Sequence, residues 1–345
     1  MKLDPVVPKK IVRDALLSLL IYAAPVALMI IALSLTGERP WDKQFVHVLS
    51  PVDRLVGGYN AYGSAMFFLV LGIFEFSMGL YGIRWNRNEK LLDLVSFAAS
   101  RLVLRPLTAY FTLKILPLVF PNVKGTLQWV PFFWGFLVIC VADDLTQYWY
   151  HRLHHQIPWL WRFHRAHHSA PYMGVTVTYR QNLFYTIFFS QIYVTATLVY
   201  LGLGVPALFV AAIKNIITVM AHSSAPWDRA LYRHKPLHPI AWLLERLIST
   251  PATHHAHHAA THGDGVGYYK GNFGNMFFLW DVIFGTAFIS RQYPERYGVS
   301  HYEGDAWYAQ FLWPVMKSSV DGSELAAGGP LVREDEPEPV TSSAS

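Results

Sequence analysis

The sequence has 345 residues, of which 53% are hydrophobic, 15% are aromatic and only 15% are charged. Soluble chains carry about 25% charged residues, so this composition is typical of a membrane protein and excludes an ordinary soluble domain. The formal net charge of +5 is modest, and because no basic stripe or RNA-binding signature accompanies it, nucleic acid is excluded as a partner. The single cysteine, Cys140, excludes both a disulfide framework and a cysteine-based zinc site.

Two apolar runs in the first quarter of the chain predict membrane spans. The run at about 15–35 follows a basic segment and is long enough to cross a bilayer, and it is too long for a signal peptide and lacks a small-residue cleavage site. The run at about 64–83 ends in the basic sequence RWNRNEK. By the positive-inside rule, the N-terminus and residues 84–90 both face the cytoplasm.

The middle of the chain contains further apolar runs. The segment at about 91–120 is interrupted by two arginines, a lysine and Pro106, so it is either one long kinked span or a re-entrant or interfacial helix. A cleaner run occupies 129–141. The runs at 183–203 and 206–220, separated by GLGVP, predict a helical hairpin. If the segment at about 91–120 crosses the membrane, the three histidine clusters, which are described in the next paragraph, all meet on the cytoplasmic face.

Histidines are concentrated in three clusters with repeated spacing. They are His151 and His155, then His164, His167 and His168, and finally His254, His257 and His258. Read as a helix, residues 144–169 place His151 and His155 one turn apart on one face, and the histidines of the second cluster do the same at i, i+3 and i+4. One metal ion rarely takes more than six ligands, so eight clustered imidazoles predict two ions. His154 and His255 stand beside better-placed partners and are left out.

The residues around the clusters favour iron over other metals. A zinc hydrolase usually mixes histidine with Asp or Glu, whereas no carboxylate lies inside any cluster, and haem needs only one or two axial histidines. Neutral imidazoles leave the ions' charge uncompensated, so a nearby carboxylate is expected. Asp144, Tyr148 and His151 fall at i, i+4 and i+7 on one helical face, which makes Asp144 and Tyr148 candidate catalytic residues. The alternatives are an Asp144 that faces water and a Tyr148 that belongs to an interfacial aromatic belt.

The last third of the chain is more polar. A helix is predicted at about 240–248, and the third cluster is followed by the glycine-rich sequence GDGVGYYKGNFG. This sequence lacks the Lys-Ser/Thr of a P-loop, so we interpret it as a turn that folds back over the metal site. Residues 317–345 are rich in Ser, Gly, Pro and acidic residues and are predicted to be disordered. The predicted domains are N-terminal membrane helices at 1–128, a catalytic domain at 129–316 and this tail.

The clusters and their flanks resemble the fatty acid hydroxylase / sterol desaturase superfamily. The boxes read H-x3-H, H-x2-H-H and H-x2-H-H. The flanking sequences are also similar: D-x3-Y-x2-HR at the first box, LWRF before the second, TP before the third and WDVIFGT after it. His222, in AHSS at the end of the hairpin, is similar to the isolated histidine that the family places between its second and third boxes. The resemblance covers roughly residues 130–290.

The resemblance implies an all-α, polytopic membrane helical bundle with a cytoplasmic, histidine-rich helical cap that holds a dinuclear metal site. It implies an enzyme with two iron ions as cofactor and O2 as co-substrate. Electrons would come from NAD(P)H through a separate cytochrome b5-like or ferredoxin-type carrier. The substrate would be a lipid (a sterol, a fatty acyl chain or an ether lipid), hydroxylated or desaturated at an unactivated C–H position. By resemblance the metal ligands are His151, His155, His164, His167, His168, His222, His254, His257 and His258.

Other implications are left open by the sequence. Asn272, Asp281 and Arg180 either support the ligands or serve ordinary packing and capping. The segment PWDRALYRHKPLHPI is longer than in the family members that the chain most resembles, and its His234 and His238 are either extra ligands or surface residues. The rival functions are a zinc-dependent membrane lipid hydrolase, which would need no oxygen, and a metal-binding transporter. The C-terminal sequence TSSAS carries no dilysine-type retention signal, which favours a bacterial inner membrane over the endoplasmic reticulum.

Overall fold

The fold is all-α, as predicted. The computed structural model describes residues 64–78, 85–261, 263–299 and 305–316, together with isolated positions between 13 and 31. Within this part of the chain the structure is mostly helical and contains no strand, apart from an isolated bridge between Ala259 and Tyr297. The predicted disordered tail at 317–345 and most of the predicted span at 15–35 lie outside the described residues.

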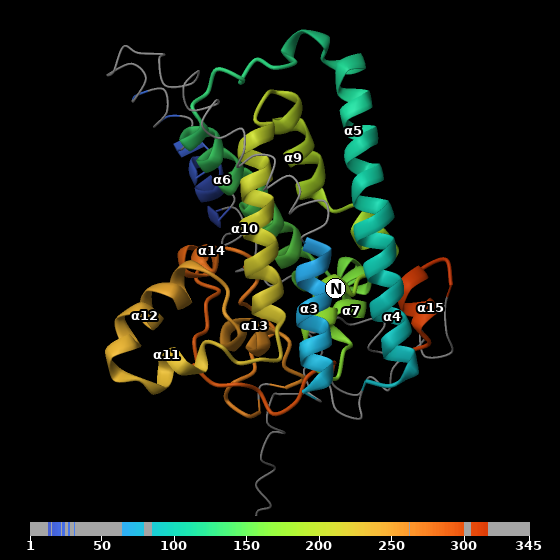
Figure 1. The fold of residues 1–345 in the computed structure, drawn as a ribbon, viewed down its shortest axis with the longest axis vertical. Coiled ribbons are helices and arrows are strands. Elements are labelled where there is room, and N and C mark those ends of the chain that lie inside the picture. The colour runs from blue at the N-terminus through green and yellow to red at the C-terminus, as the bar shows by residue number, and fades with distance from the viewer. Residues whose placement is uncertain are drawn as a thin grey trace, which may run out of the picture. The chain divides into compact units, whose positions relative to one another are not determined.

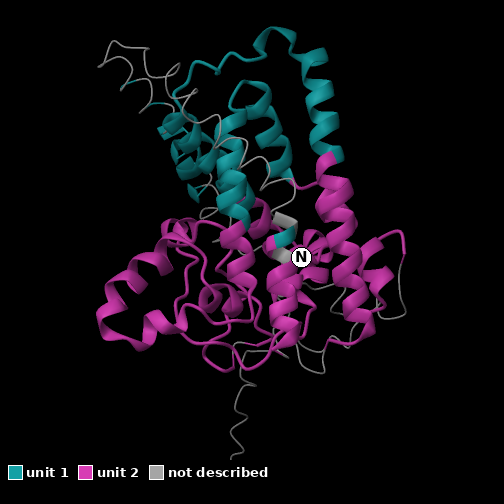
Figure 2. Cartoon of the chain, viewed as in Figure 1, with its two compact units in different colours: residues 1–66, 107–147, 190–215 teal, residues 67–106, 148–189, 216–345 magenta. Residues whose placement is uncertain are grey.

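The contacts among its residues divide the chain into two compact units (Figure 2). Unit 1 comprises residues 1–66, 107–147 and 190–215, and unit 2 comprises residues 67–106, 148–189 and 216–345. The helices that contribute residues to both units are α3 (Ser64–Ser77), α5 (Arg105–Val119), α6 (Phe132–Gln156) and α10 (Gly204–His222). The predicted domain boundaries at 128/129 and 316/317 remain predictions.

Three of the described helices are long and apolar enough to cross a membrane (Figure 1). They are Arg87–Val119, Leu183–Tyr200 and Gly204–His222. The second comprises α8 (Leu183–Ile187) and α9 (Ser190–Tyr200), and the third is α10. The runs predicted as a helical hairpin at 183–203 and 206–220 therefore form helices joined by a short turn at 201–203, and α10 begins within GLGVP, at Gly204. The side of the membrane on which they end remains a prediction.

The ambiguous segment at 91–120 is one continuous helix. It consists of α4 (Arg87–Phe97), a π-helical stretch η2 (Ala98–Leu104) and α5, and Asn86 caps its start by accepting hydrogen bonds from two backbone N–H groups. The π-helical stretch ends just before Pro106, whose ring would clash with the carbonyl four residues earlier in a regular α-helix. Arg101 and Arg105, which interrupt the apolar pattern, place their guanidinium groups over the ring of Tyr179.

Unit 1 packs the start of α6 against the hairpin of α9 and α10. Gly202, with φ of +117°, makes the turn between these helices, and a Cβ there would lie 2.6 Å from the backbone nitrogen of Gln128. Lys214 on α10 is buried and forms ion pairs with Asp143 and Asp144 of α6. Charges within apolar helices are costly unless they are paired, and here one cation serves two carboxylates.

Unit 2 contains the remaining helices, most of them short. The elements not yet given are α7 (Pro158–His168), η4 (Val175–Tyr179), α11 (Arg229–Arg233), η5 (Lys235–Leu237), α12 (His238–Leu247), α13 (Pro251–His257), α14 (Leu279–Phe284) and α15 (Trp307–Leu312). The short 3-10 turn η3 (Pro121–Val123) belongs to unit 1. The helix predicted at 240–248 is confirmed as α12.

The single helix predicted over residues 144–169 is wrong. Two helices are present instead, because α6 ends at Gln156 and α7 begins at Pro158. Ile157 between them is extended, with φ of −106° and ψ of 115°, which is the conformation that a following proline imposes on the residue before it. The break gives the first and second histidine clusters separate helices, so they do not share one helical face.

A buried cluster holds several elements of unit 2 together. Val175, Tyr179 and Val219 form its centre, and Phe67, Leu71 and Phe97 pack against it. Glu75 lies on α3, as Phe67 and Leu71 do, and is fully buried. Its carboxylate accepts hydrogen bonds from the Val175 and Ser224 N–H groups and from the Ser223 hydroxyl. This carboxylate anchors the backbone directly after His222, at the end of α10.

Candidate metal centre

The predicted ligands come together in unit 2 as two groups of buried imidazoles. The first group contains His151, His155, His164, His168 and His257, and the second contains His167, His222, His254 and His258. Within each group one nitrogen from every ring lies within 4.8 Å of the others. Together the two groups are the nine histidines identified from the sequence. Helix α7 supplies histidines to both groups. The segment formed by α13 and His258, which directly follows it, does the same.

Backbone carbonyls fix the orientation of four of these rings. Nδ1 of His151 lies 2.7 Å from the Phe273 carbonyl oxygen, and Nδ1 of His257 lies 2.7 Å from that of Gly271. In the second group, Nδ1 of His167 and of His222 contact the carbonyls of Arg180 and Thr218. A carbonyl oxygen can only accept, so each Nδ1 carries the proton and each Nε2 of the neutral ring has a free lone pair.

These unprotonated nitrogens face one another. Nε2 of His257 lies 3.1 Å from Nε2 of His151, and Nε2 of His222 lies 3.4 Å from Nε2 of His167. Two lone pairs at this distance repel unless a cation lies between them. Nitrogens bound to one ion at about 2.1 Å are themselves separated by about 3.0–3.4 Å, so the observed spacing is that of neighbouring ligands. The donor set therefore fits a metal ion in each group.

His155 provides a second sign that cations belong here. Its ring is buried in the first group, yet neither of its nitrogens has a hydrogen-bond partner. A buried, unsatisfied polar nitrogen is costly, and coordination to a metal would satisfy it. Among the residues that the structure describes, no carboxylate or thiol belongs to either group, so the positive charge would be compensated from outside the ligand set.

The glycine-rich loop folds back over the site, as predicted. Its carbonyls at Gly271 and Phe273 receive the His257 and His151 N–H groups, so one short segment orients a ring from the third box and a ring from the first. A Cβ at position 271 would lie 2.2 Å from the Thr286 carbonyl, which explains the glycine. Asn272, which lies between Gly271 and Phe273, has φ of +56°. Its side chain holds the loop by hydrogen bonds to the backbones of Thr253 and Phe288.

Asp281 supports the same loop from α14. Its carboxylate accepts hydrogen bonds from the Phe273 and Gly274 N–H groups and from the Thr286 hydroxyl. Burial raises the pKa of Asp281 to about 7, while these three donors favour the charged form. The Thr286 hydroxyl also lies 2.9 Å from the Tyr148 hydroxyl. Tyr148 is therefore connected to the loop that orients His151.

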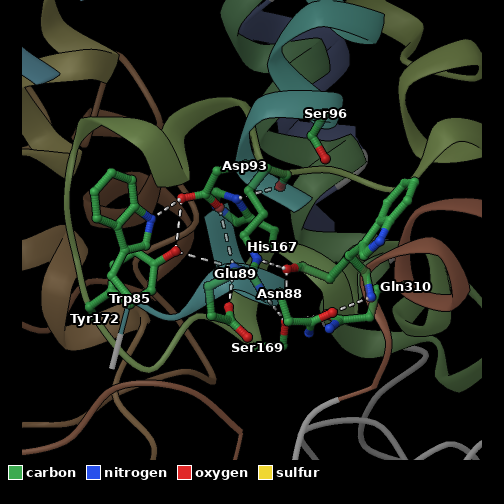
Figure 3. Close-up of polar contacts among 12 residues, drawn as sticks. Trp85, Asn88, Glu89, Asp93, Ser96, His167, Ser169, Tyr172 and Gln310 are labelled. Carbon is green, nitrogen blue, oxygen red and sulfur yellow. Dashed lines mark hydrogen bonds and ion pairs between the residues drawn. The ribbon is translucent and has the colours of Figure 1, made fainter. Parts of the chain in front are cut away.

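Arg180 connects the second box to α4, and its partners Glu89, Asp93, His167 and Ser169 are labelled in Figure 3. Its carbonyl receives the His167 N–H, and its guanidinium donates to the Ala166 carbonyl within the box and to the Ser169 hydroxyl directly after it. The same guanidinium forms ion pairs with Glu89 and Asp93 of α4. All three charged side chains are buried. Arg180 thus fixes the backbone of the second box through its guanidinium and the His167 ring through its carbonyl.

Capping interactions at the N-terminus of α13 stabilise the helix that carries the third box. Thr250 caps α13 by accepting from the Thr253 N–H, and the Thr253 hydroxyl accepts from the Thr250 N–H in return. Pro251 occupies the first turn, where its missing N–H costs nothing. The buried carboxylate of Asp228 accepts from the Ala252 N–H, which adds a negative charge near the positive end of the helix.

Burial also determines the protonation of the site. Burial lowers the pKa of seven grouped histidines outside the candidate membrane spans well below its ordinary value, and the neighbouring imidazoles lower it further. These residues are His155, His164, His167, His168, His254, His257 and His258. Neutral imidazole is the form that binds metal. The folded protein therefore presents these rings ready for coordination at neutral pH.

The other sequence candidates lie outside the two groups. Asp144 forms its ion pair with Lys214 in unit 1, and Tyr148 contacts Thr286 in unit 2, so a catalytic role for either remains a prediction. His154 contacts the Tyr150 carbonyl, and His255 contacts Tyr297 and the Ser223 carbonyl. His238 contacts the Tyr232 carbonyl, and His234 is exposed. Neither His234 nor His238 joins a group.

Three acidic residues that support the site were missed by the sequence analysis. Glu89 and Asp93 are on a helix start that reads as an ordinary polar N-terminus, and Glu75 interrupts an apolar run. An acidic residue within an apolar run was the available signal for Glu75, because such a residue needs a buried partner. For the other two, only the fold shows that they lie beside Arg180.

The Arg180 ion pairs predict a charge-dependent stability. Arg180→Met would leave Glu89 and Asp93 buried without a cation, so we expect the free energy of unfolding to fall by about 3–5 kcal/mol in chemical denaturation. Adding Glu89→Gln and Asp93→Asn should recover much of this loss, because no uncompensated charge remains. The exposed Arg233→Met variant serves as the control and should change stability by less than about 0.5 kcal/mol. If the single and triple variants were equally unstable, charge compensation would not be the reason for the loss.

The buried neutral histidines predict acid sensitivity of the metal-free protein. Their pKa is lowered in the folded state, so between the folded and unfolded pKa the unfolded chain binds more protons and stability falls as the pH is lowered. The loss should begin below about pH 6.5 and amount to about 1.4 kcal/mol per pH unit for each such histidine. Denaturation of chelator-treated protein between pH 7.5 and 5.5 measures it. A free energy of unfolding that stays constant over this range would contradict the burial of neutral rings.

The comparison with known protein families concerns the same segment of the chain. Residues 136–286 match the fatty acid hydroxylase family. The matched segment contains all nine grouped histidines and extends through the glycine-rich loop to Thr286. The match confirms the resemblance that the box spacing and flanking residues indicated. No solved structure matches the chain.

Proposed function

We propose, on the premise of the match of residues 136–286 to the fatty acid hydroxylase family of the sterol desaturase/fatty acid hydroxylase superfamily, that the chain is a membrane-bound di-iron oxygenase. It hydroxylates or desaturates an unactivated C–H position of a lipid with O2 and two external electrons. The observation that carries the proposal is the pair of buried imidazole groups with mutually facing, unprotonated nitrogens.

The number and type of donors support iron rather than zinc. The first group offers five imidazoles, whereas a structural zinc site takes four ligands and a catalytic one usually three with a water. The part of the chain that the structure describes places no carboxylate in either group, which is unusual for a hydrolytic zinc site. Two bound iron ions would supply the redox chemistry that activates dioxygen.

The protein's own residues position and isolate this chemistry. Carbonyls of the glycine-rich loop and of Arg180 hold the rings in the tautomer that binds metal. The nine imidazoles are almost completely buried, so water is kept from the metals and from the reacting carbon. The hydroxyl of Tyr148, held by Thr286 and Arg152, is the group we assign to proton exchange beside the first box. The catalytic role expected of Asp144 from the sequence stays part of the proposal.

Substrate, electron source and location complete the proposal. The candidate spans favour a substrate that stays in the bilayer, such as a sterol, a fatty acyl chain or an ether lipid. Electrons come from NAD(P)H through a cytochrome b5-like or ferredoxin-type carrier, as the resemblance to the family implies. The histidine boxes face the cytoplasm, and the bacterial inner membrane is favoured over the endoplasmic reticulum.

Metal and oxygen dependence test the proposal directly. Protein purified in detergent should contain about two irons per chain, and its turnover of membrane lipids should require both O2 and a reductant. Lipid extracts from cells with the gene should contain species that have gained one oxygen or lost two hydrogens, and these should be absent when the inactive His167→Ala variant is expressed. Fully loaded protein that contains zinc and turns over lipid without oxygen would instead identify the hydrolase.

A matched pair of histidine variants tests the ligand assignment. His167→Ala removes a donor from the four-histidine group, so we expect iron to fall toward one per chain and activity to fall more than about 100-fold. His154→Ala removes a similarly buried ring that lies outside both groups, and it should keep both irons and most of the activity. Membrane insertion should be unchanged in both. Equal tolerance of the two substitutions would show that the assignment is wrong.

A further inference from the structure

Helix α12 has an amphipathic pattern opposite to that of a helix on a soluble protein. Its buried side carries Ala241 and Glu245, four residues apart, with Glu245 held by Arg291. Its exposed side carries Ile240, Leu243 and Leu247, which follow one another at i, i+3 and i+7. In water the apolar side of a helix turns inward, so this arrangement indicates that the exposed side meets an apolar medium.

The apolar exposure continues onto α14, which contacts α12 (Figure 1). On α14, Val282 and Ile283 are exposed although Trp280, Asp281 and Phe284 are buried. We define the α12–α14 surface as Ile240, Trp242, Leu243, Leu247, Val282 and Ile283. Trp242 is 54% exposed, which is unusual for so large an apolar ring.

The charges beside this surface are of one sign. Arg229, Arg233 and Lys235 are exposed on α11 and η5. The guanidinium of Arg246, which is ion-paired with the buried Glu245, lies 4.6 Å from the Trp242 ring centroid. Within residues 226–248 and 279–284, all of which the structure describes, each acidic side chain is buried: Asp228, Glu245 and Asp281. An exposed apolar stripe with tryptophan and a purely basic border is the composition of a helix that lies at the surface of an anionic bilayer.

We propose that the α12–α14 surface inserts into the headgroup–acyl boundary of an anionic membrane. This attachment is additional to the three candidate spans and positions unit 2 against the lipid surface. A second copy of the chain is disfavoured as the occupant, because a symmetric contact would bring the basic border of one copy against that of the other. An acidic protein would match the charge but would leave the stripe of isoleucine, leucine and tryptophan without an apolar partner.

Site-directed labelling tests the lipid contact. In a Cys140→Ser background, Leu243→Cys carries a fluorophore, with Leu118→Cys, which is 82% exposed within the span Arg87–Val119, as the lipid-facing control and the exposed Gln292→Cys as the aqueous control. The protein is reconstituted into phosphatidylcholine vesicles with and without phosphatidylglycerol. The Leu243→Cys label should be quenched by spin-labelled lipid and protected from acrylamide, as at Leu118→Cys, whereas Gln292→Cys should show the reverse.

Two other outcomes would overturn the proposal. Quenching by acrylamide and not by lipid would show that the surface faces water. Protection from both quenchers would show that protein covers it, either a second copy or a different partner. Because the readout is lipid contact and not turnover, failure here leaves the oxygenase proposal standing, and failure of that proposal does not affect this one.

The basic border is tested separately. Lipid quenching of the Leu243→Cys label should increase when phosphatidylglycerol is included, since each basic residue near an anionic surface strengthens partitioning by about fivefold. The double variant Arg233→Gln with Lys235→Gln, whose side chains are exposed, should lose most of this increase. If the double variant kept the full increase, or if phosphatidylglycerol had no effect on the parent, the anionic surface would not be the partner.

Discussion

The site depends on one electrostatic constraint, the need to keep clustered imidazoles neutral with their lone pairs directed at a common point. Burial enforces neutrality, and carbonyl acceptors at Nδ1 direct the lone pair to Nε2. The surrounding structure serves this purpose. The glycine-rich loop supplies two of the carbonyls, Asp281 holds that loop in place, and the guanidinium of Arg180 fixes the backbone that supplies a third.

Negative charge is arranged around the site and not within it. Glu89 and Asp93 reach the second box through Arg180, Glu75 holds the backbone after His222, and Asp228 holds the start of α13. Each of these carboxylates acts on the scaffold of the ligands. Such an arrangement keeps the donor set purely imidazole while the ligand-bearing helices remain anchored by strong, buried interactions.

The histidines could be predicted because their spacing is a local property. Rings at i, i+3 and i+4 share a helical face wherever the helix lies, so the boxes were visible in the sequence. Their division into groups of five and four was not, because it depends on how α7 and α13 meet. The break at Ile157 had a signal, Pro158, that was outweighed by the helical pattern on both sides. Glu89 and Asp93 acquire their role only when α4 packs beside Arg180, about ninety residues later in the chain.

The shared use of two helices links the two groups energetically. Helix α7 supplies His164 and His168 to the first group and His167 to the second, whereas the segment of α13 supplies His257 to the first group and His254 and His258 to the second. An ion bound to either group would restrain both helices and thereby lower the entropic cost of ordering the donors of its neighbour. If each group binds an ion, the shared helices predict cooperative occupancy, with singly loaded molecules scarce at intermediate metal concentrations.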